Sequence, residues 1–176
     1  SADRVVVIVD VEDQATGSFG IGAGYAAGGD GFLLEASIEE KNFLGRGQYI
    51  RVAAGAGTDD ARSYSISFTE PYFLGYRLAA GFDIFKSTTS SNDYYDYSEQ
   101  GITLRVTAPI TEELATTFRY TYKTIKYEED GAFGDDDLPF TLDDKVSQTY
   151  ANLIDEGKYT QSSVSQSLVY NSLDSQ

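Results

Sequence analysis

Bulky apolar residues occupy every second position in many short segments of this chain, with small or polar residues between them. In residues 63–68, for example, Tyr64, Ile66 and Phe68 alternate with serines. A period of two is the pattern of a β-strand whose two faces meet different surroundings. Seven or eight such segments occur, and together they predict an antiparallel sheet. They are residues 18–25, 32–39, 49–54, 63–68, 76–84, 102–107, 114–123 and 163–170.

The alternation suits two architectures. A soluble β-sandwich would bury the bulky face, whereas a transmembrane β-barrel would turn it toward lipid and the small and charged face toward a watery lumen. Several segments are long enough for a bilayer, which a tilted strand crosses in roughly 9–11 residues. Aromatic residues also gather near segment ends, where an interfacial girdle would lie. These residues are Tyr25, Tyr49, Tyr72, Phe73, Tyr76, Phe85, Tyr122, Tyr127, Tyr159 and Tyr170.

The connections between segments also favour a barrel. Those at 42–47, 70–75 and 109–113 are short, and those at 87–98 and 128–158 are longer. Short turns on one side and longer loops on the other are typical of outer-membrane barrels. The first two connections on the longer side, 27–30 and 58–60, are short as well, so this sign is partial.

Two stretches fall outside the alternation. Residues 5–12 are a β-branched run that predicts a strand buried on both faces, and a short linker separates it from the segment that starts at Ser18. We therefore predict a boundary that divides residues 1–13 from a barrel over 14–176. Within the long insertion, residues 143–155 predict a helix that packs on the barrel mouth. Asp143 or Asp144 would be its N-cap, Gly157 would follow its end, and Val146, Tyr150, Leu153 and Ile154 would share one face.

Composition excludes several kinds of function. The net charge of -15 disfavours nucleic-acid binding, because phosphates would be repelled. Histidine and cysteine are both absent, which removes the common nucleophilic systems and the usual zinc sites. We predict no enzymatic activity, no cofactor and no metal. The acidic run at 135–137 does not fit the spacing of a calcium-binding EF-hand loop and is interpreted as a solvated loop.

Three carboxylates on predicted strands, Glu35, Glu39 and Asp83, could be imagined as an acid–base pair. Pairing with basic residues on the same lumenal face explains them with fewer assumptions. The candidate partners are Arg51, Arg77, Arg105 and Arg119.

Gly20, Gly22 and Gly24 lie on one face of the first segment, at a spacing that does not fit a dinucleotide-binding loop. Glycines weaken a strand because they offer no side chain to pack. They could leave room for a crowded lumen, or they could let another strand replace a loosely paired one. The residues alone leave both readings open.

Three stretches resemble the BamA family of barrel assembly factors. The sequence VEDQATGSF at 11–19 is similar to the junction between the last periplasmic POTRA domain and the first barrel strand. The sequences EKNFLGRG at 40–47 and TEPYF at 69–73 resemble the first two periplasmic turns. The resemblance implies that residues 1–13 are the last strand of a POTRA-like domain. It also implies that residues 14–176 form about eight strands, half of a sixteen-stranded barrel in the bacterial outer membrane.

The same resemblance implies a function. In that family the first strand pairs weakly with the last and forms a lateral gate, where nascent outer-membrane barrel proteins add strands by β-augmentation. The gate would be Ser18, Phe19, Gly20, Ile21, Gly22, Ala23, Gly24 and Tyr25. Accessory assembly lipoproteins and the lipid bilayer are the other implied partners. With half of the strands, the segments 18–26 and 161–174 would be open edges, and we expect self-association through them.

Two other functions remain possible from the sequence. A two-partner secretion transporter shares the overall plan. A complete eight-stranded barrel, acting as a structural anchor or adhesin, would instead pair residues 18–26 with residues 164–170 in one chain.

Overall fold

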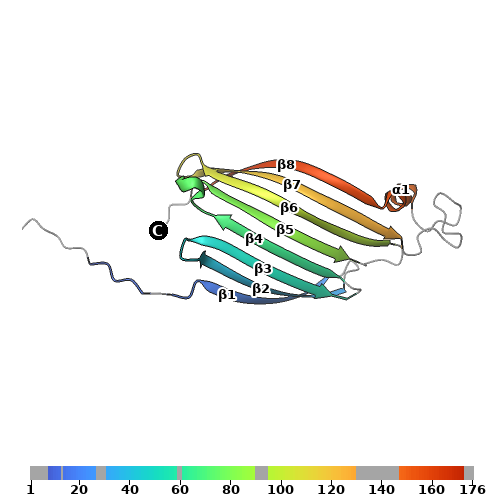
Figure 1. The fold of residues 1–176 in the computed structure, drawn as a ribbon, viewed down its shortest axis with the longest axis horizontal. Helices are drawn as coiled ribbons and strands as arrows, with labels where there is room; N and C mark the ends of the chain where they lie inside the picture. The colour runs from blue at the N-terminus through green and yellow to red at the C-terminus, as the bar shows by residue number, and fades with distance from the viewer. Residues whose placement is uncertain are drawn as a thin grey trace, which may run out of the picture.

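The computed structural model describes residues 8–12, 14–26, 31–58, 61–89, 95–129 and 147–172. Its main feature is one sheet of eight antiparallel strands, each hydrogen-bonded to the next along the chain (Figure 1). The strands are β1 (Gly17–Ala26), β2 (Gly31–Phe43), β3 (Gln48–Gly57), β4 (Arg62–Glu70), β5 (Ala79–Thr89), β6 (Tyr95–Pro109), β7 (Leu114–Glu129) and β8 (Lys158–Tyr170). The all-β fold class and the strand number predicted from the alternation are confirmed.

The sheet is open within the described residues. β1 and β8 are its opposite edges and do not pair with each other (Figure 1). The pairing of residues 18–26 with 164–170, which a closed eight-stranded barrel requires, is therefore not present in this structure. No helix among the described residues combines the length and the apolar character needed to cross a bilayer.

The register of the ladders carries each face across the sheet. Phe19, Ile38, Val52, Ile66, Ile84, Ile102 and Tyr122 form one continuous row from β1 to β7. The neighbouring row on the opposite face contains Ser18, Glu39, Arg51, Ser67, Asp83, Thr103 and Thr121. We call these the bulky face and the polar face.

The exposure of the two faces differs in the direction that a barrel wall requires. On β3 and β4, Val52 and Ile66 of the bulky face are 47% and 42% exposed, whereas Ala53 of the polar face is 7% exposed. Within the described residues, few large apolar side chains are buried, and the sheet has no apolar core of its own. Apolar side chains that are exposed to this extent on one continuous wall need another apolar medium to cover them, and lipid supplies it.

The turns and one helix lie at opposite ends of the sheet. The short connections after β2, β4 and β6 are at one end, and α1 (Gln148–Glu156) is at the other (Figure 1). The turns after β2 and β4 use the same device, because Leu44 and Leu74 each precede a glycine and have φ of 56°. The glycines, Gly45 and Gly75, also have positive φ, which a residue without a Cβ adopts at little cost.

Some predicted boundaries were wrong. The predicted loop at 87–98 is much shorter, because β5 continues to Thr89 and β6 starts at Tyr95. Tyr76 and Arg77 were predicted to lie in a strand. They belong instead to the connection that follows the 3-10 turn η1 (Phe73–Gly75). The asymmetry between short turns and long loops therefore rests on the connection between β7 and β8.

The predicted helix is present but shorter. Its end before Gly157 is confirmed, and Gly157 has φ of 66°. Ala151 is fully buried and Ile154 is 5% exposed, and both pack against Tyr95 and Tyr127. The predicted N-cap positions, Val146 and the acidic run at 135–137 lie outside the described residues.

Part of the predicted aromatic girdle was wrong, because several of its rings lie on the polar face. Tyr127 contacts Tyr97 and Tyr159 edge to face, with ring centroids 5.3 and 6.2 Å apart. By register this cluster is on the polar face, beneath α1. Tyr49 and Phe85 are on the polar face as well. These rings therefore line the lumenal side, whereas Tyr122 lies on the bulky face.

Candidate functional site at the open edge of the first strand

All eight residues predicted to form the gate lie in β1, from Ser18 to Tyr25. Each pairs with β2 on one side, from Ser18 opposite Glu39 to Tyr25 opposite Phe32. No described strand pairs with the other side of β1, so a row of backbone N–H and C=O groups is left without a neighbouring strand. Phe19 and Ile21 are 65% and 69% exposed on the bulky face. This edge can accept another strand through its backbone.

The end of β1 near the turns is held more firmly than the rest. The Ser18 hydroxyl donates a hydrogen bond of 2.9 Å to Glu39, and the Tyr49 hydroxyl donates one of 3.0 Å to the other oxygen of that carboxylate. Just before the strand, the Lys41 amide donates to the Thr16 carbonyl at 3.2 Å. These bonds connect β1 to β2 and β3 at one end.

From Gly20 to Gly24 the polar face of β1 has no side chains. A Cβ built at Gly22 or Gly24 meets nothing within 4 Å, and one at Gly20 meets only the Ser37 hydroxyl at 3.0 Å. Central strands differ, because a Cβ at Gly55 would be 2.5 Å from the Ser63 hydroxyl and 3.4 Å from a backbone oxygen of Leu34. Crowding within the described sheet therefore does not explain Gly22 and Gly24.

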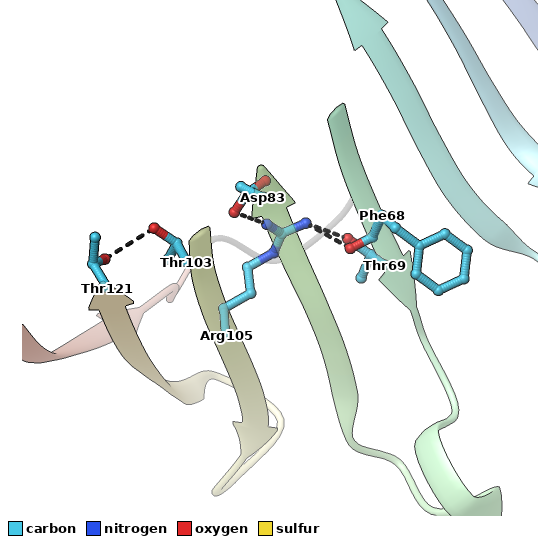
Figure 2. A network of polar contacts seen from close by, with 6 residues as sticks. All are labelled: Phe68, Thr69, Asp83, Thr103, Arg105 and Thr121. Carbon is cyan, nitrogen blue, oxygen red and sulfur yellow. Dashed lines mark hydrogen bonds and ion pairs between the residues drawn. The ribbon is translucent and has the colours of Figure 1, made fainter. Parts of the chain in front are cut away.

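The central strands are fixed by a polar network around Arg105 of β6 (Figure 2). Its guanidinium pairs with Asp83 of β5 and donates to the Thr69 hydroxyl of β4 at 2.6 Å. Nη2, the nitrogen that donates to Thr69, also donates to the Phe68 carbonyl at 3.1 Å. Beside this group, the hydroxyls of Thr103 and Thr121 are 2.9 Å apart. One side chain thus connects three adjacent strands, which the sequence did not indicate.

The carboxylates considered for acid–base chemistry have structural partners. Glu35 pairs with Arg51 at 3.0 Å, and Asp83 pairs with Arg105, as the sequence suggested. Arg119 instead donates to the Ser167 hydroxyl at 3.1 Å, and Arg77 lies in the connection between β4 and β5. Each of the three carboxylates is held by a hydrogen bond or an ion pair on the polar face. This arrangement stabilises a sheet and gives no sign of a catalytic pair.

Residues 8–12 have no regular secondary structure, and residues 1–7 and 13 lie outside the described ranges. The assignment of residues 1–13 to a POTRA-like domain therefore stays a prediction.

Comparison with known proteins agrees with this geometry. The Omp85 superfamily domain matches residues 42–176. A putative outer membrane protein assembly factor from Treponema pallidum is 38% identical over 85 residues, covering 46% of this chain and 10% of that protein. The outer membrane protein assembly factor BamA of Neisseria meningitidis is 25% identical over 116 residues, covering 62% of this chain and 14% of that protein.

A solved structure shows the same fold. The crystal structure of BamA from Haemophilus ducreyi lacking POTRA domains 1–3 superposes with a TM-score of 0.63 at 22% identity. The match covers 94% of this chain and 32% of that one, so the chain spans a small part of the relatives that it matches. The geometry of the open sheet, with its bulky and polar faces, agrees with the matched domain and with these relatives. The chain belongs to the Omp85 superfamily, with the strands of a BamA-type β-barrel of the bacterial outer membrane.

Proposed function

We propose that the protein folds and inserts β-barrel proteins into the outer membrane, and that an incoming strand pairs with the free edge of β1. Both relatives described above are named assembly factors, which favours this function over that of a two-partner secretion transporter. Strand pairing needs no covalent step, and a chain without histidine or cysteine is suited to it.

The observation that carries the proposal is the one-sided pairing of β1. On one side of β1 the backbone groups have no partner strand in the described sheet. Gly22 and Gly24 put no side chain on the polar face. Pairing through the backbone reads little side-chain sequence, so one edge can accept strands from many clients. The hydrogen bond from Ser18 to Glu39 holds one end of β1 while the glycine-rich part exchanges partners.

Contact with the bilayer follows from the exposed bulky face. The proposed clients are nascent outer-membrane barrel proteins, and accessory assembly lipoproteins are proposed as further partners. We also propose that isolated chains associate through the edges of β1 and β8, since both are open in the described sheet.

Disulfide crosslinking tests the main proposal directly, because the chain has no native cysteine. Ala23→Cys places a thiol on β1, and Ser65→Cys is the control on β4, which pairs with a strand on each side. A client barrel with one cysteine in its terminal strand is then assembled in membranes under mild oxidation. We expect a mixed disulfide with Ala23→Cys and little with Ser65→Cys.

Two outcomes would contradict the proposal. Equal crosslinking at both positions would mean that β1 has no special role. A crosslink at Ser65→Cys alone would favour passage of the client along the lumenal wall, as a secretion transporter requires.

A further inference from the structure

Basic side chains gather on the bulky face near the α1 end of the sheet. Arg62, Lys126 and Lys158 belong to one row of the register, and Lys86 belongs to the next row. Two acidic residues, Asp96 and Glu128, lie opposite each other one row farther out. The patch has four basic and two acidic residues, a balance of +2, although the whole chain has a net charge of -15. We call these six residues the basic patch.

The lysines of the patch are only partly compensated by acidic side chains. Lys126 and Lys158 lie directly opposite each other on β7 and β8, and like charges in this position repel. Lys126 pairs with Glu128 on its own strand, which offsets part of that repulsion. Within the described ranges neither Lys86 nor Lys158 forms an ion pair, and both are exposed. A charge on the lipid-facing wall of a barrel is tolerated best close to the interface, where it meets headgroups.

The surface around the lysines is hollowed in two adjoining depressions. One of about 410 Å³ is lined mainly by apolar side chains of the bulky face, among them Ile66, Ile84, Ile102 and Tyr122. The other, of about 400 Å³, is lined by the three lysines, by Thr88 and Ser98, and by the acidic residues Asp96, Glu99 and Glu128. Lys86, Gln100 and Thr124 line both. Glu99 belongs to the polar face, where it pairs with Lys123, so on the bulky face the three lysines outnumber the two carboxylates. An apolar groove therefore leads into one lined by charged and hydroxyl groups with an excess of lysines, an arrangement that suits an amphiphile.

The patch lies at the level of one leaflet. The long connection and α1 are at this end of the sheet, and short turns are at the other (Figure 1). In outer-membrane barrels the longer loops face outward and the short turns face the periplasm. The rows between the patch and the turns bear Ile84 and Phe82 on β5, so the lysines follow the apolar band in the outward direction. A headgroup of the outer leaflet would meet them there.

We propose that the basic patch binds a phosphate-bearing lipid headgroup of the outer leaflet. Lys86, Lys126 and Lys158 contact the phosphate, the hydroxyls of Thr88 and Ser98 donate to its oxygens, and an acyl chain occupies the apolar groove beside Ile84. This site is on β4 to β8, away from the edge of β1, so it does not depend on the proposed assembly function.

Native mass spectrometry tests the proposal with the folded protein in nanodiscs of phosphatidylcholine. Lipid A is the probe, and its dephosphorylated form and inorganic phosphate are the comparison ligands. The variant Lys86→Gln, Lys126→Gln, Lys158→Gln removes the site. Lys41→Gln, Arg46→Gln, Arg77→Gln removes the same charge at the turn end, and a third variant has arginine at the three patch positions.

We expect lipid A to be retained by the unchanged protein and to bind about fivefold more weakly for each lysine lost, roughly a hundredfold for all three. The turn-end variant and the arginine variant should bind as the unchanged protein does. Equal retention of dephosphorylated lipid A, equal losses in the two glutamine variants, or unchanged binding without the three lysines would each overturn the proposal. Inorganic phosphate that bound as tightly as lipid A would overturn the lipid assignment.

Discussion

Gly81 and Arg105 lie directly opposite each other on β5 and β6, and a Cβ on Gly81 would be 3.0 Å from Nη2 of Arg105. The guanidinium crosses β5 at this point to reach Thr69 and the Phe68 carbonyl on β4 (Figure 2). The glycine is needed because a side chain there would meet both the guanidinium and the backbone oxygen of Phe68. The absence of one methyl group thus allows three strands to be connected by one arginine.

Gly81→Ala is expected to destabilise the sheet by about 2 kcal/mol, because the added methyl group displaces Arg105 and overpacks the β4–β5 ladder. Gly22→Ala is the matched control, since its Cβ would meet nothing within 4 Å. Urea unfolding in lipid vesicles measures both free energies of unfolding. Equal destabilisation by the two changes would contradict the steric role of Gly81.

Asp83→Asn removes the charge that faces Arg105, whose side chain is 19% exposed. We expect a loss of about 2 kcal/mol, because a shielded guanidinium is left without its counter-charge. Glu35→Gln breaks the pair with Arg51, where the side chains are 41% and 43% exposed, and should cost less than about 1 kcal/mol. The same urea titrations compare the two. A larger effect of Glu35→Gln would show that burial does not set the strength of these pairs.

The double change Gly22→Val and Gly24→Val should slow client assembly roughly fivefold, since valine favours a pleated strand and would hold β1 more firmly against β2. A Cβ at either position meets nothing within 4 Å, so the substitutions should not destabilise the sheet. Ser165→Val on β8 is the control at the other edge. The rate of client folding in reconstituted membranes is the measurement, and an unchanged rate in the double variant would count against a gate at β1.

Ile154→Ala should release α1 from the sheet, because Ile154 and Ala151 are its buried contacts with Tyr95 and Tyr127. The expected cost is about 2 kcal/mol, confined to the helix. Hydrogen exchange of the α1 amides should rise while that of β6 and β7 stays slow. Asn152→Ala, at an exposed position of the same helix, should leave the exchange unchanged. If Ile154→Ala also left it unchanged, the helix would be held by other contacts.

Sedimentation in detergent tests the proposed self-association of the chain. Two open edges predict a dimer or larger species, because each unpaired edge offers a template for another strand. Charged side chains on the edge should oppose this, so Ile21→Lys on β1 is expected to shift the distribution toward the monomer. A monodisperse monomer of the unchanged chain would show that the edges do not associate.

Alternation was enough to predict the strands and the two faces in the middle of the sheet. Ile66 and Ser65, for instance, lie on opposite faces of β4 as their spacing requires. The strand ends were harder, because Lys86 to Thr89 have no apolar alternation. The ladder continues there through backbone pairs such as Thr89 with Tyr97. Hydrogen bonding between neighbours, and not local hydrophobicity, sets those boundaries.

The aromatic girdle failed for a different reason. Tyr122 and Tyr127 are five residues apart, and an odd separation on one strand places them on opposite faces. That signal was available in the sequence. What it could not supply was the cover for Tyr127, because the contact with α1 joins residues far apart in the chain. The contact of Arg105 with Thr69 was hidden in the same way, since it spans two ladders.

The sequential order of the strands has a consequence for how the sheet forms. Every ladder joins neighbours in the chain, so the sheet can grow one hairpin at a time from local encounters. The costly step is the hairpin of β7 and β8, which closes a connection over residues 130–157, compared with 110–113 between β6 and β7. That difference in length adds about 2 kcal/mol of loop entropy. The helix α1 lies just before β8 and docks on Tyr127 of β7. This docking shortens the free part of the connection, and so it should speed the formation of the last hairpin.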